Sequence, residues 1–194
     1  NGNLKYSEIK IISSLLGMDL NNIKNVEFTS NLETSVQLFL NNRFKITDKT
    51  FSINGKIDDL NLEHKEVENI KNFLPSYNSK IVLKDSKLDF RPGSLLNLSG
   101  LIRFDKNFDN FSIRGTTGKN FNLYGDINLS DLSVKIPNLN YLKAKNSQAN
   151  INFNIDSSKS NYKFTGLKYS SEESKIEADF IKLNKKFEIE DIKN

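Results

Sequence analysis

The chain of 194 residues has no cysteine and no tryptophan, and His64 is its one histidine. Without cysteine there can be no disulfide, thiolate metal site or cysteine nucleophile. A single histidine excludes metal sites built from several imidazoles, and a Ser-His-Asp arrangement would have to use His64. That residue stands in a polar stretch beside Glu63 and Glu66, so we expect it to be solvated. These shortages predict a protein that is not an enzyme and uses no cofactor or metal.

Long apolar runs and blocks of like charge are also missing. No stretch approaches the ~18 apolar residues that a membrane-spanning helix requires. The 28 basic and 24 acidic residues are interspersed and leave a net charge of +4, which predicts a solvated lysine face. No nucleic-acid-binding module is present, and the glycines at 115 and 118 lack the spacing of a phosphate-binding loop. We therefore expect no nucleic-acid partner.

What the sequence does contain is a series of segments in which apolar residues, with some glycines, fall at every second position. This spacing places all of them on one face of a β-strand. It is clearest between residues 98 and 155, in the sets Leu98, Gly100, Ile102, Phe104; Phe111, Ile113, Gly115; Phe121, Leu123, Gly125, Ile127, Leu129; and Ala149, Ile151, Phe153, Ile155. The spacing between segments, roughly 8 to 14 residues, is typical of a meandering antiparallel sheet.

Two stretches have helical spacing. Residues 6–16 carry apolar residues on one helical face, although a strand over 6–12 is the alternative. Residues 63–74 predict a helix of about three turns that Pro75 ends. We divide the chain into an N-terminal β segment with these short helices, 1–75, and a repetitive β-sheet segment, 76–194.

Two places along the strands need separate comment. After Leu129 the apolar positions change from odd to even, which predicts a turn or bulge at Ser130 and Asp131. The tail from residue 176 fits either two strands or a helix, and the neighbouring strands favour strands. The chain begins without a leader and ends within a pattern, so we expect a piece of a longer protein.

Residues 129–134 (LSDLSV) and 136–143 (IPNLNYLK), followed by the strand 149–155, resemble a stretch of the AsmA-like superfamily. The resemblance is closest to its YhdP branch, whose relatives include TamB, and it extends over roughly residues 41–186. Tyr141 stands where this family usually has tryptophan. The matching motif positions are Asp131, Leu132, Pro137, Leu139, Tyr141 and Lys143.

The resemblance implies a mainly β fold, with an elongated, twisted antiparallel sheet curled into an open trough. It also implies a periplasmic protein, anchored in the inner membrane of a Gram-negative bacterium by a segment outside this chain. Its partners would be phospholipid acyl chains moving between the inner and outer membranes, and outer-membrane or periplasmic proteins. The groove lining would be Leu98, Ile102, Phe104, Phe111, Ile113, Phe121, Leu123, Ile127, Leu129, Ile151, Phe153 and Ile155.

Two other interpretations remain open at this point. In a structural β-rod, solenoid or outer-membrane assembly scaffold, the same apolar face would be a closed core at native packing density. In a lipocalin-like barrel, the strands would have to close on themselves. The interpretations differ in whether the apolar face stays open.

Overall fold

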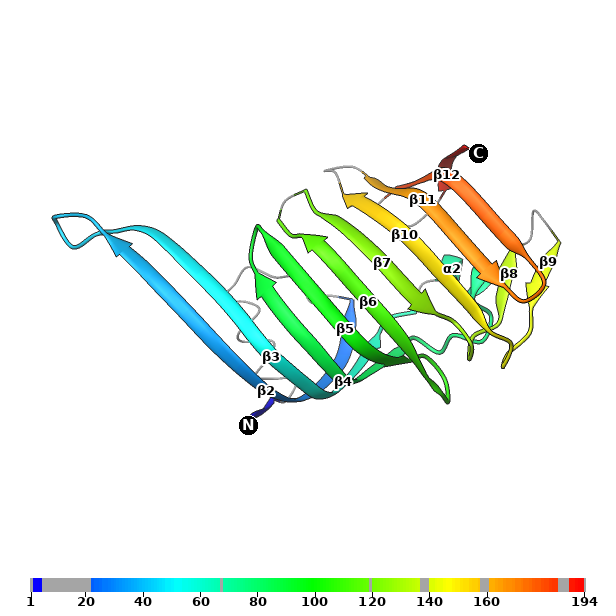
Figure 1. Cartoon of the computed structure of the whole chain (residues 1–194), viewed down its shortest axis with the longest axis horizontal. Coiled ribbons are helices and arrows are strands. Elements are labelled where there is room, and N and C mark those ends of the chain that lie inside the picture. The colour runs from blue at the N-terminus through cyan, green and yellow to red at the C-terminus, as the bar shows by residue number, and fades with distance from the viewer. Residues whose placement is uncertain are drawn as a thin grey trace.

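The computed structural model describes residues 2–4, 22–66, 68–118, 120–136, 140–157, 161–184 and 189–193. Most of these residues belong to one antiparallel sheet of eleven strands, and a second sheet has two strands. The helical part of the described chain is the short helix α2 (Glu68–Phe73). Figure 1 shows an elongated, twisted sheet with the small second sheet and α2 at one end.

The main sheet follows the order of the chain, except that β8 and β9 leave it. Its two edge strands, β1 and β13, do not pair with each other, so the sheet is open as predicted. Its strands are β1 (Gly2–Leu4), β2 (Ile23–Leu40), β3 (Ile46–His64), β4 (Lys80–Arg91), β5 (Leu95–Arg103), β6 (Phe108–Thr116), β7 (Asn122–Asn128), β10 (Ala149–Ser157), β11 (Asn161–Ser171), β12 (Lys175–Asn184) and β13 (Ile189–Lys193).

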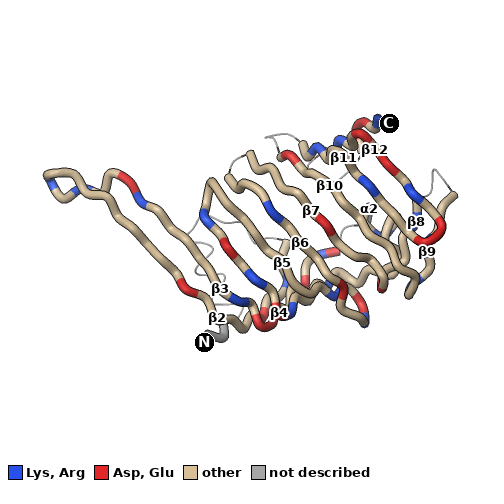
Figure 2. The backbone as a smooth tube through the Cα atoms, viewed as in Figure 1, with Lys and Arg blue, Asp and Glu red and all other residues tan. Residues whose placement is uncertain are grey.

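The register of the strands converts the alternation in the sequence into two unlike faces. Leu98 lies opposite Ile113, and Ile127 lies opposite both Phe111 and Ile151. Paired residues project to the same side of a sheet, so apolar residues from successive strands share one face. We call this side the apolar face. The other side, the polar face, carries amide, carboxylate and basic side chains, and Figure 2 shows where the charged residues lie along the backbone.

Two bulges keep the apolar residues on the same face along strands that would otherwise change side. The β4–β5 register shifts between Lys84 and Lys87, where Asp85 has a φ of 49°. A second shift between β10 and β11 coincides with Gly166, whose φ is 56°. An extra residue in one strand reverses the alternation beyond it. The bulge at Asp85 thereby lets the odd-numbered Leu83 and the even-numbered Leu88 project to the same side.

The predicted interruption at Ser130 and Asp131 is confirmed, and it is larger than a bulge. Residues 130–132 form a bend, and the chain then leaves the main sheet to form β8 (Val134–Ile136) and β9 (Tyr141–Lys143). These strands pair only with each other in the described part of the chain. Together with α2 they form a small second layer at one end of the apolar face (Figure 1).

The helix predicted for 63–74 is shorter in the structure, and the first part of the prediction was wrong. Strand β3 continues to His64 because Glu63 pairs with Lys80 of β4 and His64 pairs with Ile23 of β2. Ladder hydrogen bonds on both sides override the helical spacing of these residues. Helix α2 therefore spans only Glu68–Phe73.

The other predictions of local structure have different outcomes. The tail forms strands β12 and β13, as favoured over a helix. The helix predicted for 6–16 lies outside the described residues. The division at residue 75 stays a prediction, although β3 and β4, which lie on either side of it, pair in one sheet.

Candidate functional site

The apolar face is the candidate site, and the structure places the predicted lining residues on it. On β5, β6, β7 and β10 the strand register aligns Leu98 with Ile113, and Leu123 with Ile155. Phe121 and Leu129 lie at the two ends of β7; the Phe121 ring contacts Tyr162, with centroids 6.3 Å apart. The lining residues thus form one continuous surface across four neighbouring strands.

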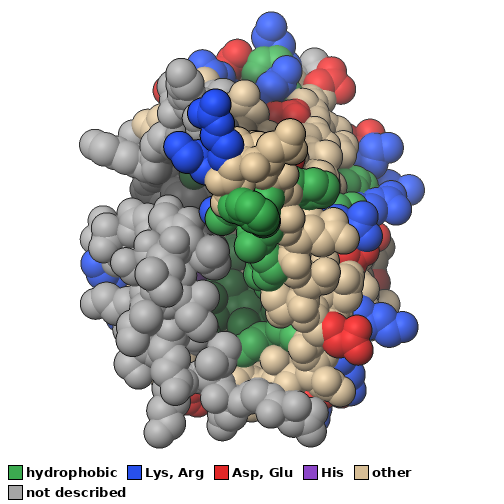
Figure 3. Space-filling view, turned by 90° about the vertical axis from the view of Figure 1, so that its left-hand side faces the viewer, with side chains coloured by type: hydrophobic (Ala, Val, Ile, Leu, Met, Phe, Trp, Pro, Cys, Tyr) green, Lys and Arg blue, Asp and Glu red, His purple; other side chains and the backbone are tan. Residues whose placement is uncertain are grey.

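Exposure divides this surface into two halves along the strand direction. Ile102, Phe111 and Leu129 are buried, at 5 to 7% exposure; Leu129 lies in the cluster beneath the second layer, and Ile102 and Phe111 form a separate cluster with Leu83 of β4. The remaining lining residues are half-buried: Leu98, Phe104, Ile113, Phe121, Leu123, Ile127, Ile151, Phe153 and Ile155. We call the first part the covered half and the part beyond it, from Leu98 and Ile113 to Ile155, the open half. Figure 3 shows hydrophobic side chains in a hollow along the sheet.

Phe153 shapes the floor of the open half and does not project from it. Its ring lies over Gly125, so closely that a Cβ at Gly125 would stand 2.4 Å from the ring. Phe164 packs beside it, with ring centroids 5.5 Å apart. The glycine leaves room for an aromatic ring to lie flat on the strand, and this replaces the missing side chain with apolar surface.

The second layer covers the part of the other half around Leu129 with tightly packed side chains. Leu132 is fully buried, and Val134 and Tyr77 are each 7% exposed. They form one cluster with Ala149 and Tyr169 of the main sheet. From α2 and the turn that follows it, Ile70 and Leu74 pack against the same cluster, so this half of the face is an ordinary core.

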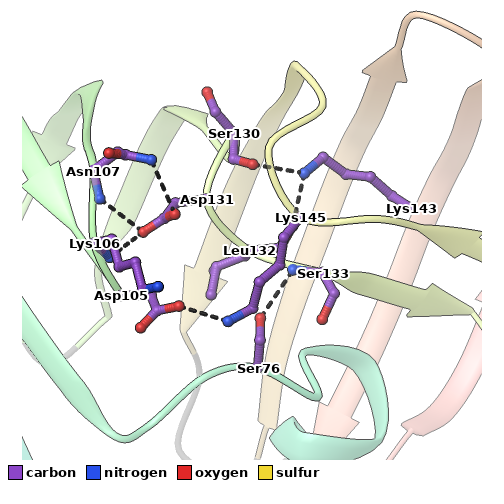
Figure 4. A network of polar contacts seen from close by, with 10 residues as sticks. All are labelled: Ser76, Asp105, Lys106, Asn107, Ser130, Asp131, Leu132, Ser133, Lys143 and Lys145. Carbon is purple, nitrogen blue, oxygen red and sulfur yellow. Dashed lines mark hydrogen bonds and ion pairs between the residues drawn. The ribbon is translucent and has the colours of Figure 1, made fainter.

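A carboxylate holds the chain where it crosses from the main sheet into the second layer. Asp131 is 2% exposed, and its carboxylate accepts hydrogen bonds from the backbone N–H groups of Lys106 and Asn107. The Asn107 amide adds a third bond at 3.2 Å. Asp131 therefore fixes the β5–β6 turn against the crossover, as Figure 4 shows.

A buried lysine closes the same crossover from the other side. The Lys143 ammonium donates to the carbonyls of Ser130 and Leu132 at 3.1 and 2.7 Å (Figure 4) and to that of Ala144 at 3.1 Å. These are all the donors that an ammonium has. Burial lowers the pKa of Lys143 below its usual value, and the charges of Asp109 and Asp131 oppose this shift.

Tyrosine hydroxyls complete the polar contacts beneath the second layer. The Tyr141 hydroxyl lies 2.9 Å from that of Tyr169 and 3.0 Å from Ser171 Oγ. Burial, together with the hydrogen bond to Tyr141, raises the pKa of Tyr169. Burial also raises the pKa of Tyr77 to about 12. The Tyr77 hydroxyl oxygen lies 2.5 Å from His64 Nε2. The hydroxyls of Tyr77, Tyr141 and Tyr169 therefore all have hydrogen-bond partners.

His64 corrects one expectation from the sequence. It is half-buried, not solvated, and its ring packs on Tyr77 with centroids 5.5 Å apart. Its Nδ1 lies 2.6 Å from the carbonyl oxygen of Lys65. Both ring nitrogens are thus occupied by structural contacts. Its polar neighbours in the sequence did not reveal this, because Tyr77 reaches His64 only through the pairing of β3 with β4.

The motif positions gather in the second layer and not in the open half. Asp131, Leu132, Tyr141 and Lys143 all support the crossover or its packing. Pro137 and Leu139 lie outside the described residues. These residues build and hold the cover of one half of the apolar face. Their chemistry is structural, since each polar group is engaged by its neighbours in the protein.

The polar face offers hydrogen-bonding chemistry but no reactive arrangement. Tyr124 donates to Asn152 at 2.8 Å, Asn150 donates to Asp126 at 2.7 Å, and the Arg114 guanidinium stacks over Tyr124. These pairs connect neighbouring strands on the side exposed to water. Within the described ranges, no group of three histidine, cysteine or acidic residues is placed to hold a metal ion.

Sequence reasoning missed one surface, the outer part of the β2–β3 hairpin. Val36, Leu38, Phe39, Leu40, Phe44 and Ile46 are all about half exposed or more. The signal was Phe39, an apolar residue that breaks the alternation of Val36, Leu38 and Leu40 and so makes both faces of the strand apolar.

Comparison with known proteins adds no relative to these observations. No family model, no curated protein and no solved structure matches the chain. In the part of the chain that the structure describes, no helix has the length and apolar character needed to cross a bilayer.

Proposed function

We propose that this chain shelters phospholipid acyl chains on the open half of its apolar face, as a segment of a periplasmic AsmA-like protein that carries lipid between two membranes. The observation that carries the proposal is the chemistry of that surface. On β5, β6, β7 and β10 the positions facing this side in the open half are Leu96, Leu98, Gly100, Ile113, Gly115, Leu123, Gly125, Phe153, Ile155 and Ser157.

A surface of this kind suits a flexible hydrocarbon better than a ligand with polar groups. Apart from Ser157, which is 8% exposed at the end of β10, those positions offer no charged or hydrogen-bonding side chain that would fix the orientation of a headgroup. Transfer of an acyl chain to such a surface is favourable by about 0.8 kcal/mol for each CH₂ group that is buried. The gain does not depend on position along the face, which allows the chain to slide.

The extent of the half-buried surface supports the same proposal. Contiguous apolar patches larger than a few hundred Å² are rare on soluble monomers and mark binding surfaces. The half-buried residues run across neighbouring strands from Leu98 on β5 to Phe164 on β11 without interruption. The resemblance of residues 129–143 to the AsmA-like superfamily agrees with a lipid ligand.

A structural β-rod is the second candidate, and one observation favours it. The second layer already fills the covered half at the density of a protein core, with Leu132 fully buried. A further protein segment of similar kind would close the open half in the same way. The experiment below separates the two candidates, because a protein cover and a lipid give different crosslinked products.

The test places a photo-crosslinking amino acid at Ile113, which faces the open half. The control is the same amino acid at Ser112, the adjacent residue on the polar face; both are half-buried. Each variant is irradiated with vesicles that contain a radiolabelled phospholipid, and labelled protein is measured on a gel. We expect strong labelling from Ile113 and only background from Ser112.

Two results would contradict the proposal. Equal labelling from both positions would mean that the lipid does not distinguish the faces. Crosslinking of Ile113 to protein alone, in the presence of the lipid, would indicate a closed core and favour the β-rod. Repeating the pair at Leu123 and Tyr124 on β7 guards against a local effect of one substitution.

A further inference from the structure

The outer part of the β2–β3 hairpin stands apart from the rest of the sheet. β1 pairs with β2 only at residues 28–30, and β4 pairs with β3 only at residues 53–63. Beyond these points, the described strands offer β2 and β3 no neighbour except each other. Figure 1 shows this two-stranded arm projecting past the other strands. Every residue from 33 to 50 is exposed.

The end of this arm carries large apolar side chains on both faces. Leu38 and Leu40 project to the apolar face, at 55 and 54% exposure, while Phe39 projects to the opposite side at 49%. Phe44, in the turn, is 86% exposed. A strand that packs against a core on one face carries apolar side chains on that face and polar side chains on the other. Apolar residues stand on both sides of the tip, and the described residues offer neither side a core to pack on.

The turn holds Phe44 outward in a defined position. Asn41 Oδ1 accepts the backbone N–H groups of Arg43 and Lys45, and the Asn41 carbonyl accepts that of Phe44 at 2.9 Å. Phe44 has a φ of 56°, a conformation that bulky residues rarely adopt. Asparagine or glycine would be less strained there. The chain nevertheless presents a phenylalanine at the apex.

Charge around the tip has one predominant sign. The turn itself, residues 41–46, carries Arg43 and Lys45 and no acidic residue, while the rest of the arm from 33 to 50 has Glu33, Asp48 and Lys49. None of the basic residues forms a salt bridge with any described residue. Figure 2 shows the basic positions at the far end of the arm.

We infer that the tip of the β2–β3 hairpin inserts into the interface of an anionic phospholipid bilayer. The tip lies along the interface, so that Leu38, Phe39, Leu40 and Phe44 contact the upper acyl region while Arg43 and Lys45 reach headgroup phosphates. Side chains that are apolar on both faces and flanked by cations match the layered chemistry of a bilayer surface. A protein partner would match one face of the ribbon. The inference does not depend on the proposed function, since it concerns a different surface.

The test measures co-sedimentation of the full chain with vesicles. One set is phosphatidylcholine alone, and the other is equal parts phosphatidylcholine and phosphatidylglycerol. We expect wild type to bind the anionic vesicles more tightly, and added salt to weaken that binding. Phe44→Ser should weaken binding to anionic vesicles about tenfold. Arg43→Glu should weaken it about fivefold or more.

Matched controls use other exposed residues far from the tip. Leu142→Ser removes an apolar side chain that is 66% exposed on β9, and Lys168→Glu reverses an exposed charge on β11; both should bind like wild type. The inference is overturned if wild type does not bind anionic vesicles, or if Phe44→Ser and Leu142→Ser bind equally. It is also overturned if Phe44→Ser abolishes self-association in sedimentation velocity, since the partner would then be a second copy. Labelling from Ile113 is measured separately, so failure of either proposal is distinguishable.

Discussion

The same apolar face ends in two different ways at the two ends of this molecule. Around β7, β10 and β11 it is covered by β8, β9 and α2, and Leu132 of that cover is fully buried. Along the arm of β2 and β3 it is bare, and Leu38 is more than half exposed. Both regions are built from the same alternating strands. The difference shows that the alternation specifies the sheet but not what lies on it.

Polar groups explain why the cover stays in place at one end. The crossover brings the carboxylate of Asp131 and the ammonium of Lys143 under the second layer, where backbone groups satisfy both. Buried polar groups are tolerated when they are fully hydrogen-bonded, and they then select one arrangement of the chain. Among the described residues, the arm has no comparable anchor beyond its own turn, and none of them covers it.

The largest effect should come from truncating the cover. Leu132→Ala leaves a cavity among Tyr77, Val134 and Ala149 and should lower the free energy of unfolding by about 3 kcal/mol. Leu142→Ala, on neighbouring β9 but 66% exposed, should change it by less than ~0.5 kcal/mol. Urea denaturation followed by circular dichroism measures both. Similar losses in the two variants would show that Leu132 is not the centre of this core.

Most of the sheet was predictable because its signal is local. Between residues 98 and 155, each alternating segment forms a strand by pairing with the next segment of the same period. The short turns between consecutive segments bring the two strands into register. The break at Ser130 was visible for the same reason, as a change from odd to even positions. The residues predicted to line a groove, being the alternating ones, therefore share one face, and their role as a lipid lining stays a prediction.

The second layer was not predictable in this way, because its contacts join distant segments. Ser76 Oγ accepts the backbone N–H of Ser133, and Lys145 Nζ lies 2.6 Å from Asp105. Neither pair has a sequence pattern. The helical spacing of residues 63–74 was outweighed by pairing with Lys80, a contact that depends on the whole sheet. The exposure of the lining residues depends on this second layer. The sequence therefore could not predict which lining residues belong to the covered half and which to the open half.

The second-largest effect should be a loss of folding stability at alkaline pH, caused by Tyr77 at the covered end. The pKa of Tyr77 is raised to about 12 from 10.0, so the folded state holds this proton more tightly than the unfolded state. The resulting stability is complete below pH 10 and is lost as the pH rises from 10 to 12. The loss attributable to Tyr77 should be about 2 kcal/mol. Urea titrations of wild type and Tyr77→Phe at intervals across this range test it, and parallel curves would contradict it.

The smallest effect should come from the bare end. Leu38→Ala removes a side chain of the same type as Leu132→Ala, yet it should change the free energy of unfolding by less than ~0.5 kcal/mol. The reason is that Leu38 is already 55% exposed and contributes little burial on folding. Val26→Ala, at the buried base of the same strand, is the matched control and should cost more than about 1 kcal/mol. A loss at Leu38 as large as that at Val26 would mean that a second copy covers the arm in solution. Repeating the measurement at tenfold lower protein concentration would then reveal it, because stability from association depends on concentration.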